Sequence, residues 1–156
     1  MLKYADYDIV FREIPDEVTL AINLSNCPHK CAGCHSPHLR EDIGELLSPT
    51  ALTELLSRYS AAVTCVCFMG GDANPNEVCL MADFVRKTSG NKLKTAWYSG
   101  FNTLKKNKYS RSFDYIKLGE YIEQLGALDK KTTNQRLYKI ENGYLKNITQ
   151  QLQNTI

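Results

Sequence analysis

The sequence predicts an α/β fold on a mainly parallel, open sheet, the architecture of a partial (βα) barrel. Segments with the character of strands alternate with segments of helical periodicity along most of the 156 residues. This order favours a parallel sheet with right-handed crossovers. The βα units are too few for a closed eight-stranded barrel, which typically needs about 250 residues. With no internal repeat or linker, we expect a single domain spanning residues 1–156.

The first strand is expected at 18–25, VTLAINLS, where apolar residues alternate with smaller or polar ones. A helix should begin at Pro49, because Ser48 is a suitable N-cap and proline fits the first helical position. Leucines then recur at helical spacing and predict one buried face. The apolar run 61–69, AAVTCVCFM, predicts a strand that is covered on both faces.

A second helix should begin after Asn74, at Pro75, with Glu77 in a capping-box-like position. Gly90 and Asn91 indicate where this helix ends. Three further strands are expected, at 93–99, 113–119 and 135–140.

Shorter features complete the expected pattern. Residues 101–108 predict a short helix, and residues 120–126 predict one or two helical turns. The last residues, 142–156, are expected to form a polar tail. In such a fold the loops at 26–37 and 70–75 both leave carboxyl ends of strands, the edge where α/β sheets bind ligands.

Composition excludes several classes of function. Apolar residues make up 43% and charged residues 23%, an ordinary globular balance. The net charge of +2 is too small to predict nucleic-acid binding. No apolar run approaches the ~20 residues that span a bilayer, and the first residues are charged rather than apolar as in a signal peptide. We therefore expect a cytoplasmic protein that binds neither nucleic acid nor membrane.

The loop NCPHKCAGCHSP, at 26–37, holds three of the six cysteines in the spacing Cys-x3-Cys-x2-Cys. In a reducing cytosol, clustered cysteines are more often metal ligands or catalytic groups than disulfides. A closed zinc site would need His29, His35 or His38 as its fourth ligand, and His38 is a better candidate than His35, which is adjacent to Cys34. A four-iron cluster with three cysteines would keep one iron open for a substrate or cofactor. The spacing favours the cluster and leaves zinc as the alternative.

With these residues the chain resembles the radical S-adenosylmethionine (SAM) enzymes, whose signature is this three-cysteine spacing and whose fold is a partial (βα) barrel. GGD at Gly70, Gly71 and Asp72 resembles the family's second motif, usually Gly-Gly-Glu, which contacts the methionine part of the cofactor. Glycines allow a close backbone approach there, and an acidic residue can meet an ammonium group.

The resemblance implies a [4Fe-4S] cluster held by Cys27, Cys31 and Cys34, with SAM bound at the open iron. It also implies a set of residues that position SAM: Gly33, Cys34, His35, Gly70, Gly71 and Asp72. His35 stands where related radical SAM activating enzymes often carry tyrosine. The cofactor supplies the chemistry, so no separate general base or other catalytic residue is expected.

Within this superfamily, the segments GGDANP, WYSG (97–100) and 116–136 resemble the activating proteins of anaerobic ribonucleoside-triphosphate reductase, a glycyl-radical enzyme. The resemblance covers about residues 7–140. It implies an oxidoreductase that cleaves SAM reductively and uses the 5′-deoxyadenosyl radical to form a glycyl radical on the reductase. A second partner would be a flavodoxin- or ferredoxin-type electron donor, which the lysines of 105–108 could attract.

Two other functions remain as alternatives. One is a radical SAM enzyme that acts on another glycyl-radical enzyme or on a small molecule, and the other is a zinc-binding interaction domain. Cys65 and Cys67 share one face of their expected strand, and together with Cys79 they are interpreted as apolar core residues. The segment 132–136, TTNQR, either shapes a partner surface or begins the last strand.

Overall fold

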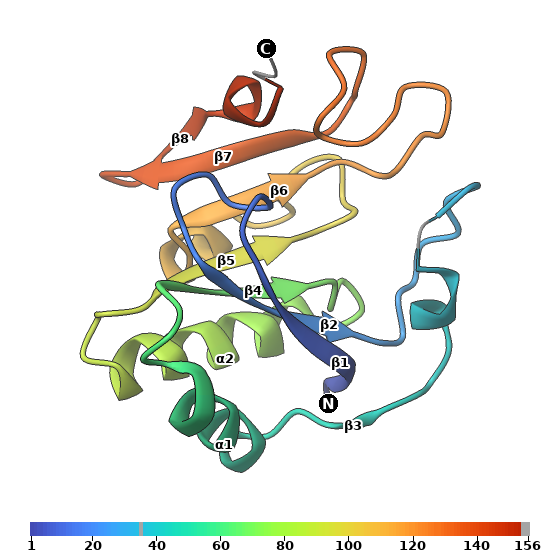
Figure 1. The fold of residues 1–156 in the computed structure, drawn as a ribbon. Coiled ribbons are helices and arrows are strands. Elements are labelled where there is room, and N and C mark those ends of the chain that lie inside the picture. Colours follow the sequence, from blue (N-terminus) through green and yellow to red (C-terminus); the bar gives the residue numbers. More distant parts are fainter. Residues whose placement is uncertain (35, 154–156) are drawn as a thin grey trace.

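The computed structural model describes residues 1–34 and 36–153, which contain an eight-stranded sheet in the order β3-β1-β2-β4-β5-β6-β7-β8 (Figure 1). Four adjacent strands at the centre of this sheet run parallel: β2 (Thr19–Leu24), β4 (Cys65–Met69), β5 (Lys94–Tyr98) and β6 (Tyr115–Leu118). The structure confirms the expected α/β open sheet with a parallel core, consistent with a partial (βα) barrel.

Antiparallel strands flank this parallel centre on both sides. They are β1 (Lys3–Val10) and β3 (Glu45–Leu46) next to β2, and β7 (Arg136–Glu141) and β8 (Tyr144–Asn147) next to β6. The expected last strand is β7, but β1, β3 and β8 were not anticipated. The expectation of a polar tail is therefore wrong, because Asn142 and Gly143 form a two-residue hairpin turn. Their φ angles are 50° and 81°, as such a turn requires.

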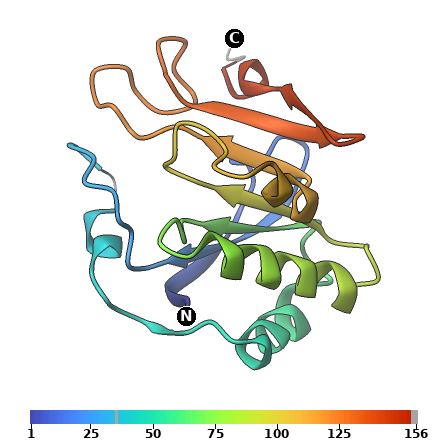
Figure 2. The same cartoon turned by 180° about the vertical axis from the view of Figure 1, so that it is seen from behind.

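Helix α1 (Pro49–Tyr59) begins where the sequence predicts, and the Ser48 hydroxyl accepts a hydrogen bond from the Ala51 amide at 3.1 Å. Its buried residues are Leu52, Leu55 and Leu56. Figure 2 shows α1 and α2 (Pro75–Thr88) against the same face of the sheet. In the described part of the chain, no helix is both long enough and apolar enough to cross a membrane.

Helix α2 also begins at its predicted proline, although its amino-terminal cap differs from the expected arrangement. The Asn74 side chain does not cap the helix but donates to Glu77 Oε2 at 2.9 Å. Beyond the helix, Gly90 and Asn91 both have positive φ, as expected for residues that end it. The face of α2 toward the sheet buries Val78, Met81, Ala82 and Val85.

The expected short helix at 101–108 is wrong, because the 3-10 helix found there spans Asn107–Ser112. The Phe101 carbonyl instead accepts a hydrogen bond from the Gly119 amide at 2.6 Å, which ties the start of this segment to the loop after β6. Residues 120–126 form a turn rather than a helix. Two further 3-10 helices are Pro37–Arg40 and Thr149–Leu152.

Both faces of the parallel strands are covered, as the continuous apolar run at 61–69 predicts. Val66 and Phe68 of β4 face the helices, whereas Cys65 and Cys67 face the opposite side. On that side Ile14, from the segment between β1 and β2, is fully buried against the sheet. Burial raises the pKa of both the Cys65 and the Cys67 thiol, so the interpretation of these residues as apolar core is confirmed.

Candidate functional site

The predicted site loops meet at the carboxyl edge of the parallel strands. The cysteine loop follows β2, the GGD loop follows β4, and residues 99–101 follow β5. Figure 1 shows the strands β4, β5 and β6 pointing toward the side on which the cysteine loop lies. The parallel direction of these strands is what brings the loops to one edge.

Backbone hydrogen bonds fold the cysteine loop back toward the segment that follows it. The Asn26 amide donates to Glu41 O at 3.1 Å, and the Cys27 amide donates to Leu39 O at 2.9 Å. From the following 3-10 helix, Arg40 Nη2 donates to the Cys31 carbonyl at 2.7 Å. The thiols thus lie on a closed loop that is held by hydrogen bonds to residues 39–41.

The three thiols of the loop are free, and each is partly exposed. Partial burial is the largest cause that raises the pKa of the Cys27 thiol, and the nearby Asp72, Cys34 and Cys31 raise it further. In the part of the chain that the structure describes, no group of three His, Cys, Asp or Glu side chains is arranged to hold a metal ion. The donor set fits a cluster with one open iron, but the thiols must draw closer together to hold it.

Gly33 and His35 complete the part of the predicted site that lies in this loop. Gly33 has a φ of 73°, and a Cβ atom there would lie 2.7 Å from the carboxylate of Glu123. Only glycine fits this turn without displacing that side chain. His35, which was expected to position the cofactor, lies outside the described residues.

Asp72 is the most deeply buried acidic group of the site, with 2% of its side chain exposed. Its Oδ2 atom accepts a hydrogen bond from the Gly100 amide at 2.7 Å and lies 2.5 Å from His29 Nε2. Its Oδ1 atom is buried and has no partner among the described residues. A buried carboxylate oxygen without a donor is costly, and a water or ligand that donates a hydrogen bond would relieve that cost.

Gly70 and Gly71 both adopt positive φ, at 102° and 85°. A Cβ atom on Gly71 would lie 2.5 Å from Val78 Cγ2 and 2.8 Å from Leu24 Cδ1, so packing leaves no room for a side chain there. The Gly70 carbonyl accepts a hydrogen bond from the Trp97 indole at 2.8 Å. These two glycines form the turn that delivers Asp72 to the edge of the sheet.

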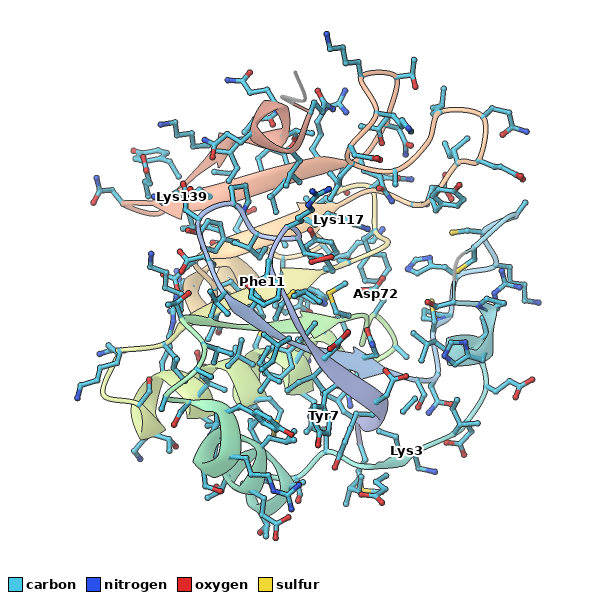
Figure 3. All side chains as sticks on the ribbon, viewed as in Figure 1. Lys3, Tyr7, Phe11, Asp72, Lys117 and Lys139 are labelled. Carbon is cyan, nitrogen blue, oxygen red and sulfur yellow. The ribbon has the colours of Figure 1, made fainter. Side chains whose placement is uncertain are left out.

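Lys117 is a site residue that sequence reasoning missed. It lies on β6 with 8% of its surface exposed, and its ammonium donates to Ser99 O at 2.9 Å and Gly119 O at 3.0 Å. Burial lowers the pKa of Lys117 to about 8. The nearby Asp72 and Cys31 act in the opposite direction and raise this pKa, but burial outweighs them. Figure 3 labels both Asp72 and Lys117. The available signal was a single lysine inside the apolar strand FDYIKLG.

The segment 132–136 packs into the fold as a turn that leads into β7. Thr133 and Gln135 are buried, and the Thr133 hydroxyl donates to Gly126 O at 2.9 Å. Arg136 donates back to the Thr133 carbonyl at 2.6 Å and is the first residue of β7. These contacts agree with the interpretation that the segment begins the last strand.

An α/β sheet with a three-cysteine loop at its carboxyl edge defines a class of metal- or cluster-binding protein. Residues 18–141 match the family described as the 4Fe-4S single cluster domain, and the chain belongs to this family. It is a 4Fe-4S cluster domain of the radical SAM type. Searches of curated proteins and of solved structures gave no match.

Proposed function

We propose that this protein is the activase of anaerobic ribonucleoside-triphosphate reductase, which cleaves SAM reductively and uses the 5′-deoxyadenosyl radical to generate a glycyl radical on the reductase. The observation that carries the proposal is the position of the cysteine loop beside Asp72, in a chain of the 4Fe-4S single cluster family. The segments that resemble such activases, at 97–100 and 116–136, lie on β5 and β6 and the loops that follow them.

Cys27, Cys31 and Cys34 would hold the cluster. Three thiolates supply one ligand fewer than a four-iron cluster normally takes, so one iron would be left open for SAM. The loop that carries these thiols is partly exposed and rests on backbone hydrogen bonds, so its side chains can converge without disturbing the core.

The charges of Asp72 and Lys117 are opposite to those of the ammonium and carboxylate groups of the methionine part of SAM. The unpartnered Oδ1 of Asp72 suits the SAM ammonium group. Lys117 has three N–H donors, and the two carbonyls that it contacts leave one for the SAM carboxylate. The other residues that we expect around SAM are Gly33, Cys34, His35, Gly70 and Gly71.

Lys105 is a basic residue that suits an electron donor. Its Nζ atom lies 5.2 Å from the centroid of the Phe101 ring, and that ring contacts His29 of the cysteine loop. Lys94, by contrast, is bonded to Glu17 at the opposite end of β5. An exposed positive charge near the cluster loop would attract an acidic flavodoxin or ferredoxin.

The test is anaerobic reconstitution followed by three measurements. We expect iron and sulfide in the protein, 5′-deoxyadenosine after reduction with SAM, and a glycyl doublet in the electron paramagnetic resonance spectrum when the reductase is added. If 5′-deoxyadenosine forms but the glycyl doublet does not, the protein is a radical SAM enzyme that acts on a different substrate. Full occupancy by zinc without SAM cleavage would contradict the enzymatic function altogether.

A further inference from the structure

His29 lies between Cys27 and Cys31 in the sequence, yet its side chain is directed at a different loop. Its Nε2 atom is 2.5 Å from Asp72 Oδ2, and 21% of the histidine side chain is exposed. This contact joins the cysteine loop to the GGD loop across 43 residues of sequence. The spacing of the cysteines gives no indication of it.

The loop after β5 completes the surroundings of the imidazole. The ring of Phe101 packs edge-on against His29, with 5.3 Å between the ring centroids and 82° between the planes. A Cβ atom on Gly100 would lie 2.7 Å from His29 Cδ2, so the glycine leaves the space that the imidazole fills. The Gly100 amide also donates to Asp72 Oδ2 at 2.7 Å.

We propose that His29 is a positioning residue for SAM, which orients the Asp72 carboxylate so that Oδ1 stays free for the SAM ammonium group. This inference rests on the proposed function. His29 and the Gly100 amide both engage Oδ2, and turning the carboxylate would break both contacts. The oxygen that they leave is Oδ1, which is buried and lacks a partner among the residues described.

The same contact sets the distance between the cysteines and Asp72. His29 is two residues from Cys27 on one side and from Cys31 on the other. Holding its ring against Asp72 and Phe101 therefore holds the backbone that carries these two thiols. SAM must meet the cluster and Asp72 together, so its affinity should depend on a residue that touches neither iron nor cofactor.

The experiment compares His29→Ala and His29→Gln with His38→Ala as the matched control, because His38 is an exposed histidine of the same segment. Each variant is reconstituted, its iron and sulfide are measured, and SAM binding is followed by calorimetry. We expect the dissociation constant of SAM to rise about tenfold in His29→Ala, while the variant still assembles the cluster. His29→Gln keeps an N–H donor and should recover most of the affinity.

Two further measurements separate positioning from a merely structural role. In SAM cleavage, His29→Ala should raise KM and leave kcat close to that of the wild type. In the cluster-free protein, the Gly100 amide should exchange its hydrogen faster in His29→Ala than in His38→Ala, because its acceptor is no longer fixed.

Unchanged or tighter SAM binding by His29→Ala would overturn the positioning role, and tighter binding would show that His29 competes with the cofactor for Asp72. Those results leave the proposed function intact if wild-type protein binds and cleaves SAM. Wild-type protein that carries the cluster but does not bind SAM would overturn the proposed function, and the role of His29 with it.

Discussion

Lys94 Nζ lies 2.7 Å from Glu17 Oε2 at the amino end of the parallel strands, the end opposite the cysteine loop. The same carboxylate accepts hydrogen bonds from the Thr64 hydroxyl and the Tyr115 hydroxyl, both at 2.8 Å. Glu17 precedes β2, Thr64 precedes β4, and the other two residues begin β5 and β6. One buried carboxylate thus joins the starts of four neighbouring strands.

Replacing this carboxylate by Glu17→Gln should lower the free energy of unfolding by about 2 kcal/mol at neutral pH. Burial opposes ionisation of Glu17, but the bonds from Lys94, Thr64 and Tyr115 outweigh it and lower its pKa below the ordinary 4.5. The stabilisation is therefore present above pH 4.5 and is lost as the pH falls through the lowered pKa. Urea unfolding of the wild type and of Glu17→Gln at several pH values measures the difference in their free energies of unfolding. If acidification lowers the free energy of unfolding equally in both proteins, the prediction is wrong.

The second prediction concerns Lys117, whose pKa burial lowers from 10.5 to about 8. Between these values the unfolded chain binds more protons at this position than the folded chain, so the contribution of Lys117 to stability rises with pH. The slope approaches about 1.4 kcal/mol per pH unit within that window. In urea unfolding, Lys117→Met should lack this rise of the free energy of unfolding with pH. The control Lys92→Met, at an exposed lysine, should retain the rise. Identical pH profiles for wild type and Lys117→Met would contradict the prediction.

Asp72→Asn should retain the cluster but weaken SAM binding by at least about tenfold, because the amide keeps the shape of the side chain and loses its charge. Asp83 lies exposed on α2, so Asp83→Asn is the control for a general loss of negative charge. Calorimetry on reconstituted protein measures the affinity. An Asp72→Asn protein that binds SAM as wild type does would remove the carboxylate from the cofactor site.

Gly71→Ala should destabilise the fold by about 2–3 kcal/mol, because the new methyl group overlaps Val78 and Leu24 and the residue keeps a positive φ. Gly143 shares the positive φ, but a Cβ atom there would meet nothing within 4 Å. Gly143→Ala should therefore cost about 1 kcal/mol, the backbone penalty alone. Urea unfolding of the two variants separates overlap from backbone strain, and equal losses would show that overlap contributes nothing.

Serine at Cys27, Cys31 or Cys34 should abolish assembly of the four-iron cluster, because the loop has no fourth cysteine to replace the lost thiolate. Cys79→Ser should retain the cluster, since Cys79 lies on α2 and packs against the core. Iron and sulfide analysis after anaerobic reconstitution compares the cluster content of these variants with that of the wild type. Full iron content in any of the three loop variants would remove that cysteine from the ligand set.

The parallel centre of the sheet was predictable because its apolar runs and helix caps are local signals. β4 is apolar without interruption, and both helices begin at a proline that the sequence displays. The antiparallel flanks were harder to predict, because β1 carries charges and β8 is wholly exposed. In β8 the strand depends on the Asn142-Gly143 turn and on pairing with β7 rather than on burial.

Part of the site was likewise predictable from local sequence, and part was not. The cysteine spacing and the GGD motif identify two of its loops, since each motif lies within a few residues of sequence. The bond from His29 to Asp72 and the burial of Lys117 depend on contacts between loops that only the folded sheet brings together. A histidine in a loop and a lysine in a strand look ordinary until their partners are known.

The contrast between the thiols of the loop and those of β4 determines where oxidants can act. Cys65 and Cys67 are fully buried with raised pKa values, so they stay protonated and inaccessible to peroxide. The partly exposed thiols at 27, 31 and 34 are free to form sulfenic acids or disulfides with one another once iron is lost. Damage by air should therefore begin in one loop and leave the sheet intact, and a thiol reductant should restore the ligands before further oxidation makes the loss permanent.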